Sequence, residues 1–377
     1  MRLTSLLAVG LVLITAVCAF PQEDGVIKSW DFEADVEDWV TPDSKGEIGR
    51  TDVKEAVYKG QWSLEFKFPQ RGIPEGETGE IPGIFAVPLP DGAPALQTVS
   101  FAVATAFSVP LIVAIDEEDG SSYSTIIWSQ AGQWNECVLQ LADFRLGDDS
   151  SDENAKLDPD QVKSLAFGDG SLFMRMIGEA GVPIYVPPAQ PMRIWMDELV
   201  LSSKEPEKPD VATEEDKTKV VIDKCDDATI KWLVLGGDDL SLKTVTPEDD
   251  EAKYLEIGYL SPAGKLFACV RPITVGSLAD CTSISFEVKV EMDAQLFLNV
   301  EDTREWRYST VENVQAKPDW QRIEIPLASM QAEADSGAQG QVDASKIKQF
   351  VIADVKAMLE STISANTWSV RNVTAHK

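Results

Sequence analysis

Apolar and polar residues alternate along short stretches of the chain, the pattern of antiparallel strands that bury one face. Four stretches show this alternation: residues 99–103, 137–141, 284–290 and 323–327. Residues 111–115 and 296–300 are mostly apolar, and each stretch is followed directly by two carboxylates. Clusters of glycine, proline, asparagine and aspartate separate these stretches, and long amphipathic helical patterns do not occur. The sequence therefore predicts an all-β fold.

The pattern occurs twice. The segment WNECVLQL that begins at Trp134 recurs as WQRIEIPL at Trp320, 186 residues later. LDPDQVKS at Leu157 recurs as VDASKIKQ at Val342, at an offset of 185. Two more pairs keep this offset, Phe101 with Phe286 and Asp169 with Asp354. A period of this size is too long for a solenoid unit and indicates two copies of one globular domain.

We therefore predict two tandem β-sandwich (jelly-roll) domains, at residues 20–203 and 219–377. Each domain has a length that one hydrophobic core can support. The linker, residues 204–218, is rich in charge and proline, which favours an extended, solvated segment and domains that move independently. In both copies, residues 157–166 and 342–351 are expected to form one helical turn before a strand.

The N-terminus has the features of a secretory signal. Arg2 precedes an apolar run from Leu6 to Val17, too short to span a bilayer, and small residues follow it. We expect cleavage of residues 1–19 and a secreted, periplasmic or extracellular protein. Cys18 leaves lipidation open, although Val17 fits a lipobox poorly. No later stretch approaches the length of a membrane span.

Charge and histidine content exclude several function classes. With 63 acidic and 33 basic residues, the chain is too acidic to follow a phosphate backbone, so nucleic acid is not an expected partner. The only histidine is His376, next to the C-terminal residue. Ser-His-Asp or Cys-His catalysis and zinc chemistry are therefore not expected, and we predict that the protein is not an enzyme.

Several segments carry a resemblance to a known superfamily. They are WDFE at Trp30 with Trp39, QWSL at Gln61, AGQW at Ala131, LDP at Leu157 and IWMDEL at Ile194. The first copy resembles galactose-binding-like jelly rolls, and the second copy does so more weakly. This superfamily includes non-catalytic carbohydrate-binding modules of secreted glycosidases and the complex I intermediate-associated protein domain. The resemblance implies the fold and only weakly the ligand.

The resemblance also implies a structural calcium ion in the first domain. Members of the superfamily commonly hold Ca²⁺ between a carboxylate on the first strand and an aspartate on the last, positions occupied here by Glu33 and Asp197. Asp31 is expected on the same strand face as Glu33, and main-chain carbonyls of residues 51–54 are expected to complete the shell. In the second copy, Cys225 and Arg371 replace the two carboxylates, so that copy should lack the ion.

Two function classes stay open: a carbohydrate-binding protein, and a surface-associated structural protein that binds other proteins. The expected saccharide-binding residues in the first copy are Tyr123 and Trp128 with Asp116 and Asp119, and in the second copy Trp306 and Tyr308. Exposed rings would stack on a pyranose and carboxylates would bind its hydroxyls. Four other tryptophans recur at matched positions, which suits structural roles: Trp39, Trp134, Trp232 and Trp320.

Two further features have expected roles. Residues 171–193 form an apolar insertion in the first copy, which we expect to pack on the sandwich. Cys137 aligns with the inward-facing Ile323 and should be a buried free thiol. A disulfide among Cys225, Cys269 and Cys281 remains open, with Cys269–Cys281 closing the shortest loop between strands.

Overall fold

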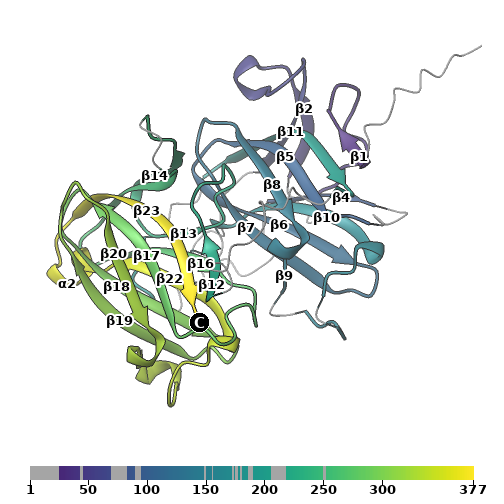
Figure 1. Ribbon diagram of the computed structural model, residues 1–377. Helices are drawn as coiled ribbons and strands as arrows, with labels where there is room; N and C mark the ends of the chain where they lie inside the picture. The colour runs from purple at the N-terminus through teal and green to yellow at the C-terminus, as the bar shows by residue number, and fades with distance from the viewer. Residues whose placement is uncertain are drawn as a thin grey trace, which may run out of the picture.

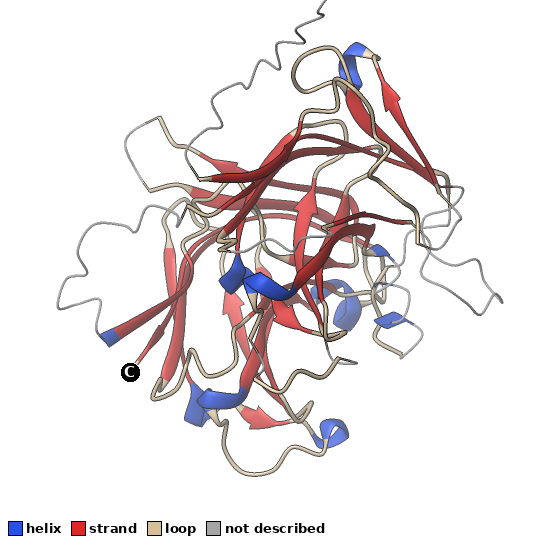
Figure 2. Cartoon of the chain, turned by 90° about the vertical axis from the view of Figure 1, so that its right-hand side faces the viewer, coloured by secondary structure: helices blue, strands red, loops and turns tan. Residues whose placement is uncertain are grey.

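The structure is a computed structural model that describes residues 25–42, 46–68, 83–89, 95–147, 150–154, 156–171, 174, 177–178, 181–185, 190–204, 218–248 and 252–377. The predicted signal peptide and most of the predicted linker (residues 205–217) lie outside these residues. Within them, nearly all regular structure is strand, and the helices are single turns or little more (Figure 2). The prediction of an all-β fold is confirmed.

The first domain is a sandwich of two antiparallel sheets. One sheet has the order β2-β3-β11-β5-β8, with β1 paired to the end of β11. Its strands are β1 (Val26–Trp30), β2 (Glu47–Thr51), β3 (Ser63–Phe68), β5 (Thr98–Thr105), β8 (Asn135–Gln140) and β11 (Met192–Ser202). The other sheet has the order β4-β10-β6-β7-β9. Its strands are β4 (Ile84–Pro88), β6 (Val109–Glu117), β7 (Ser122–Ser129), β9 (Arg145–Leu146) and β10 (Val162–Asp169).

The second domain repeats this arrangement. One sheet has the order β14-β15-β23-β17-β20, with β12 paired to β23. Its strands are β12 (Lys219–Asp223), β14 (Asp238–Val245), β15 (Tyr254–Ser261), β17 (Ser283–Val290), β20 (Gln321–Pro326) and β23 (Ser364–His376). The other has the order β13-β16-β22-β18-β19-β21. Its strands are β13 (Leu233–Leu235), β16 (Phe267–Pro272), β18 (Ala294–Asp302), β19 (Arg307–Val314), β21 (Gln331–Ala332) and β22 (Ile347–Asp354), and the short helix α2 (Lys356–Glu360) follows β22.

The duplication read from the sequence is confirmed strand by strand. The bounds of β5, β6, β7 and β10 recur 185 residues later as β17, β18, β19 and β22, and β8 recurs as β20 at 186. The two helical turns are also present, as 3-10 turns at Pro159–Gln161 before β10 and at Ala344–Lys346 before β22. Figure 1 shows the two sandwiches side by side, the first in purple to teal and the second in green to yellow.

Each domain has its own core between its two sheets. In the first, alternate residues of facing strands bury aromatic rings, with Phe85 and Phe167 stacked at 5.5 Å between ring centroids. In the second, Tyr259 stacks on Phe267 at 3.9 Å, and Trp368 meets both rings edge-on. Period-two alternation in the sequence therefore does correspond to the inward faces of the sheets.

A third apolar cluster joins the two domains. Met174 and Ile184, from the insertion at 171–193, pack with buried residues of the second domain, among them Leu235 and Val270. The main chain continues the contact, because the N–H of Leu266 donates to the carbonyl of Pro183 at 2.8 Å. The insertion therefore packs as expected, but its described residues lie against the neighbouring domain. The sequence indicated domains that move independently, and this shared apolar cluster couples them instead.

Within the described residues, no helix combines the length and the apolar character that crossing a membrane requires.

Candidate functional site

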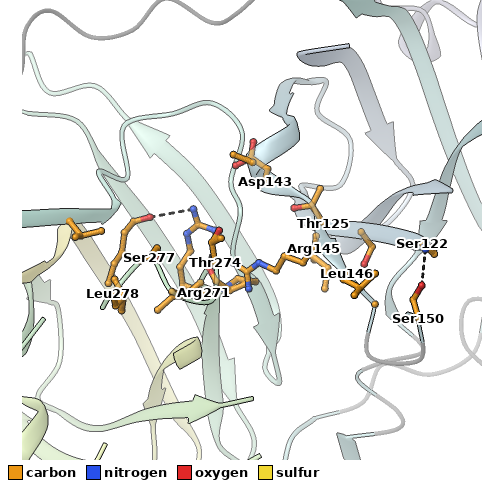
Figure 3. A pocket seen from close by; sticks show the side chains of 18 of the residues that line it. Ser122, Thr125, Asp143, Arg145, Leu146, Ser150, Arg271, Thr274, Ser277 and Leu278 are labelled. Carbon is orange, nitrogen blue, oxygen red and sulfur yellow. Dashed lines mark hydrogen bonds between the residues drawn. The ribbon is translucent and has the colours of Figure 1, made fainter. Parts of the chain in front are cut away.

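A pocket of about 980 Å³ lies between the two sandwiches. One wall comes from β7, β9 and the loops around them, and the other from β12, the end of β16 and the loop after β16 (Figure 3). Hydroxyl groups come from both domains: Ser122, Ser124, Thr125, Ser150, Ser151, Thr274 and Ser277. Aliphatic side chains lie among them, including Ile126, Val221 and Leu278, and the described lining residues include no aromatic ring. The volume is that of a ligand site, and the lining mixes polar and apolar groups.

Residues with outward positions on β7 form the floor of this pocket. The buried face of β7 carries Tyr123 and Ile127 in the core of the first domain. Ser122, Ser124 and Ile126 alternate with them and reach the pocket, because successive side chains of a strand point to opposite faces. β9 then pairs with β7 through Ser124 and Arg145, which places Arg145 beside this row.

Arg145 crosses from the first domain to the second. Its Nη1 donates to the main-chain carbonyl of Lys348 at 2.9 Å. Its Nε is buried and has no hydrogen-bond partner. Burial first, and then the charge of the nearby Arg271, lower the pKa of the Arg145 guanidinium to about 10. It still carries its full charge at neutral pH, in surroundings that do not favour a cation.

The other charged groups at this pocket are paired with one another. Lys231 Nζ lies 2.8 Å from both carboxylate oxygens of Asp143. Arg271 Nε lies 2.8 Å from Oδ2 of Asp223, and the Arg271 guanidinium also donates to main-chain carbonyls, including that of Lys231. Among the described residues, no carboxylate forms a salt bridge with Arg145. Among the described charged residues that line the pocket, Arg145 is therefore the one without a salt bridge, and the charge of Asp143 acts on it only from a greater distance.

Two of the rings that we expected to bind a saccharide are in the cores. Tyr123 is 2% exposed and Tyr308 is fully buried. Tyr123 and Tyr308 occupy the same position of β7 and β19. The Tyr123 hydroxyl donates to the Asp152 carboxylate, and the Tyr308 hydroxyl donates to the carbonyl of Gln339. A ring at a position that both copies fill with tyrosine is part of the shared core, and neither ring has a face available for stacking in this structure.

Trp128 is buried in the contact between the domains. It is 2% exposed and packs in the core cluster of the second domain, and the main-chain N–H of Trp128 donates to the carbonyl of Ile230 at 2.8 Å. Strand pairing identifies its counterpart in the second domain as Asn313, because Trp128 lies opposite Pro110 and Asn313 lies opposite Gln295. Asn313 is exposed. Trp128 thus differs between the copies because only the first domain packs a neighbour at this position.

The remaining expected ligand residues are nearer the surface. Asp116 is half-buried, pairs in register with Ser122 and accepts a hydrogen bond from Ser164 at 2.8 Å. Asp119 is exposed in the β6–β7 turn, beside Gly120 of the pocket lining. These two carboxylates therefore border the pocket. Trp306 does not line it, and the Arg304 guanidinium covers one face of the Trp306 ring at 3.7 Å.

The expected calcium ligands Glu33 and Asp197 both accept hydrogen bonds from the turn at residues 59–63. Glu33 Oε1 accepts from the N–H groups of Gln61 at 2.7 Å and Trp62 at 3.1 Å. Asp197 Oδ2 accepts from the N–H of Lys59 at 3.0 Å and from Ser63 Oγ at 2.8 Å. Asp197 has no exposed surface, and burial raises the pKa of its carboxyl above the usual value.

Asp31 does not share a strand face with Glu33. β1 ends at Trp30, and Phe32 has a φ of 57°, which turns the chain out of the extended conformation. The Asp31 carboxylate instead accepts from the N–H of Glu33 at 3.1 Å. The described residues contain no group of three or more acidic, histidine or cysteine side chains placed to hold a metal ion. Any ion at this turn would depend on main-chain carbonyls for much of its shell.

Sequence reasoning missed two aromatic pairs that are partly exposed. Tyr58 lies 5.5 Å from Trp134 in the first domain, and Tyr254 lies 5.5 Å from Trp320 in the second. Trp39 and Trp232 are buried, as a structural role requires, whereas Trp134 and Trp320 are only partly buried. Recurrence in the sequence did not distinguish the buried tryptophans from the partly buried ones. A ring repeated in a surface contact and a ring repeated in the core both appear as a tryptophan at matched positions.

His376 contacts a serine outside the pocket between the domains. Its Nε2 lies 2.7 Å from Oγ of Ser285, a buried residue in β17. In the described part of the chain, no carboxylate bonds the other ring nitrogen, and neither residue lines the pocket between the domains. The orienting group of a catalytic triad is therefore missing from this contact.

Comparisons with known proteins give a likeness to solved structures. No protein-family model and no curated protein matches the chain. The chain is similar to the family 11 carbohydrate-binding module of the cellulosomal cellulase Lic26A-Cel5E of Clostridium thermocellum, at 15% identity over 42% of this chain and 94% of that one, with a TM-score of 0.33.

A second similarity spans both domains. The tandem pair CBM22-1-CBM22-2 of Paenibacillus barcinonensis Xyn10C is 14% identical over 95% of this chain and 99% of that one, with a TM-score of 0.28. A Clostridium thermocellum family 11 module in complex with a β-1,3-1,4-mixed-linked tetrasaccharide is 13% identical over 42% of this chain and 95% of that one, with a TM-score of 0.32. The fold stands on the sheet topology described above, and function has to be argued from the site.

Proposed function

We propose that this chain is a non-catalytic carbohydrate-binding protein that holds a saccharide in the pocket between its two sandwiches. The observation that supports it is the pocket itself, with a volume of about 980 Å³ and hydroxyl-bearing side chains on both walls. A saccharide offers hydroxyl edges and C–H faces. Serine and threonine hydroxyls can bond the first, and aliphatic groups such as Ile126 and Val221 can pack against the second.

The contact between the domains prepares this pocket for a ligand. Gln130 receives the N–H of Leu242 at 3.1 Å and donates to the carbonyl of Leu240 at 3.3 Å, so one side chain joins the first domain to β14 of the second. The Lys231–Asp143 pair adds a half-buried ion pair across the same contact. Walls that are fixed before binding reduce the entropy lost on association.

The charges at the pocket support binding without catalysis. Hydrolysis of a glycosidic bond generally uses two carboxyl groups on either side of it. Asp143 is the one carboxylate among the described lining residues, and Lys231 occupies both of its oxygens. The pocket can therefore supply donors and acceptors to a sugar, but the described residues do not supply an acid and a base.

Two finer points belong to this proposal. The protein is exported after removal of residues 1–19, and a calcium ion stabilises the turn at residues 59–63. The buried Asp197 supports the second point, since its charge lacks a cation among the described residues and its pKa is raised by burial. Glu33 lies at the same turn and adds a second carboxylate.

A glycan array with the full-length mature protein tests the function, and a pocket-filling variant tests the site. Ser124→Phe places a ring in the pocket and should abolish binding to any glycan that the wild type retains. Ser309→Phe is the matched control, since Ser309 has the equivalent position in β19 and does not line the pocket. If no glycan binds the wild type, the proposed function is wrong. Unchanged binding by Ser124→Phe would place the glycan elsewhere.

A further inference from the structure

The charges at the pocket narrow the class of saccharide, if the proposed function holds. The protein as a whole carries a formal charge of −30, with 63 acidic and 33 basic residues. Among the described residues that line the pocket, Arg145, Arg271 and Asp143 are charged, and Asp116 and Asp119 lie at its border. Asp143 is paired with Lys231 and Asp223 with Arg271, and among the described residues Arg145 forms no salt bridge, so only the more distant charge of Asp143 opposes its own.

The arrangement of the Arg145 guanidinium also leaves hydrogen-bonding capacity. One of its nitrogens holds the carbonyl of Lys348, and its Nε is buried without a partner. A buried polar group without a partner costs free energy, and the cost is larger when the group is charged. Figure 3 shows the Arg145 side chain extending from β9 toward Arg271, between the serines of the first domain and Thr274 of the second.

We propose that the pocket binds an acidic saccharide, with the Arg145 guanidinium receiving a carboxylate or sulfate group of the sugar. Arginine presents donors in a planar fork that matches either group, and an ionised partner strengthens each hydrogen bond. Ser122, Ser124 and Thr274 then bond the hydroxyls of the same sugar or its neighbours. The acidic surface elsewhere repels such a polymer, so its retention reports on this pocket.

Burial and the nearby Arg271 lower the pKa of Arg145, and the charge of Asp143 offsets them only in part. A bound anion would relieve both effects.

Pairs of polymers that differ only in charge test the proposal with the full-length protein. Polygalacturonate is compared with its methyl ester, and dextran sulfate with dextran, by affinity electrophoresis and isothermal titration. We expect retention by a charged member and none by its neutral partner. Polygalacturonate alone would identify the group as a carboxylate, and dextran sulfate alone as a sulfate.

Three variants separate the charge of Arg145 from its contact with Lys348. Arg145→Gln keeps a donor for the carbonyl of Lys348 but removes the charge, and should weaken binding by about tenfold or more. Arg145→Lys keeps the charge but not the planar fork, and should retain part of the affinity that Arg145→Gln loses. Arg193→Gln removes an exposed arginine of β11 and should change nothing.

The outcomes distinguish binding of an acidic saccharide from carbohydrate binding in general. Equal or stronger binding to the neutral polymers, or full affinity in Arg145→Gln, overturns the acidic-saccharide proposal and leaves carbohydrate binding intact. If Arg145→Lys loses affinity as far as Arg145→Gln does, the Arg145 charge is not the recognition element. Failure of every polymer and of the glycan array overturns the proposed function as well.

Discussion

Asp197 and Arg371 occupy the same place in the two sandwiches with opposite charge. Asp197 pairs with Ala102 across β11 and β5, and Arg371 pairs with Glu287 across β23 and β17. Each is followed by a residue with positive φ, Glu198 at 48° and Asn372 at 55°, so the same irregularity of the last strand is present in both domains. In the second domain the Arg371 guanidinium lies 2.6 Å from the Glu287 carboxylate. In the first domain the Asp197 carboxylate is buried, and no described cationic side chain forms a salt bridge with it.

We predict that calcium raises the melting temperature of the full-length protein and that Asp197→Asn abolishes this response. A metal that binds only the folded state stabilises it by about 2.7 kcal/mol at a hundredfold excess over Kd. Because burial raises the pKa of Asp197, protons compete with the ion, and the shift should shrink as pH falls toward that pKa. Differential scanning calorimetry with calcium and with EDTA measures it.

Glu198→Gln is the control, since Glu198 is the adjacent carboxylate and pairs with Lys59 at the surface. It should keep the calcium response. An equal response to EDTA in wild type and Asp197→Asn would show that any calcium effect arises elsewhere.

We predict that Glu287→Gln destabilises the protein by about 1 kcal/mol at neutral pH. The Glu287 carboxylate is half-buried, and its hydrogen bonds therefore contribute less to stability than hydrogen bonds to a fully buried charge. Burial acts to raise the pKa of Glu287, but hydrogen bonds from Arg371 and Asn372 outweigh it and the pKa lies below its usual value. A carboxyl with a lowered folded pKa contributes stability above its unfolded pKa of about 4.3 and loses it as pH falls. Urea unfolding at pH 7 and pH 3.5 should therefore show a difference from wild type that is smaller at the lower pH. A difference that is constant with pH would assign the effect to packing on Trp320.

We predict that Trp128→Ala lowers the free energy of unfolding by about 3–5 kcal/mol, because it empties a ring-sized volume in the contact between the domains. Urea denaturation measures the loss, and small-angle scattering should show a larger radius of gyration if the domains separate. Asn313→Ala, the equivalent exposed position, should change stability by less than about 0.5 kcal/mol. Wild-type stability in Trp128→Ala would mean that the ring is not enclosed.

We predict that the four described cysteines, Cys137, Cys225, Cys269 and Cys281, are reduced thiols that react slowly in the native protein. Burial raises the pKa of each, to about 12 for Cys137, and only the thiolate is reactive. Labelling with Ellman's reagent should be slow in buffer and rapid in guanidinium chloride. A mass lower by about 2 Da under non-reducing conditions would instead reveal a disulfide.

The repeated residues determined much of the fold. Phe101 and Phe286 lie at matched positions of β5 and β17, and Trp134 and Trp320 directly precede β8 and β20. Alternation also placed Cys137 in the core as a free thiol. These features depend on local period and spacing, since a strand's inward face follows directly from the order of its residues.

The tertiary structure alone decided which rings are available and where the pocket lies. The sequence predicted Trp128 as a saccharide-binding residue, and in the structure the second domain covers its ring. Arg145 gave no signal in the sequence, because its place beside Arg271 depends on two segments that lie far apart in the chain. Contacts between domains bury surface that no local pattern marks, so the sequence determined the two sandwiches and only their packing created the site between them.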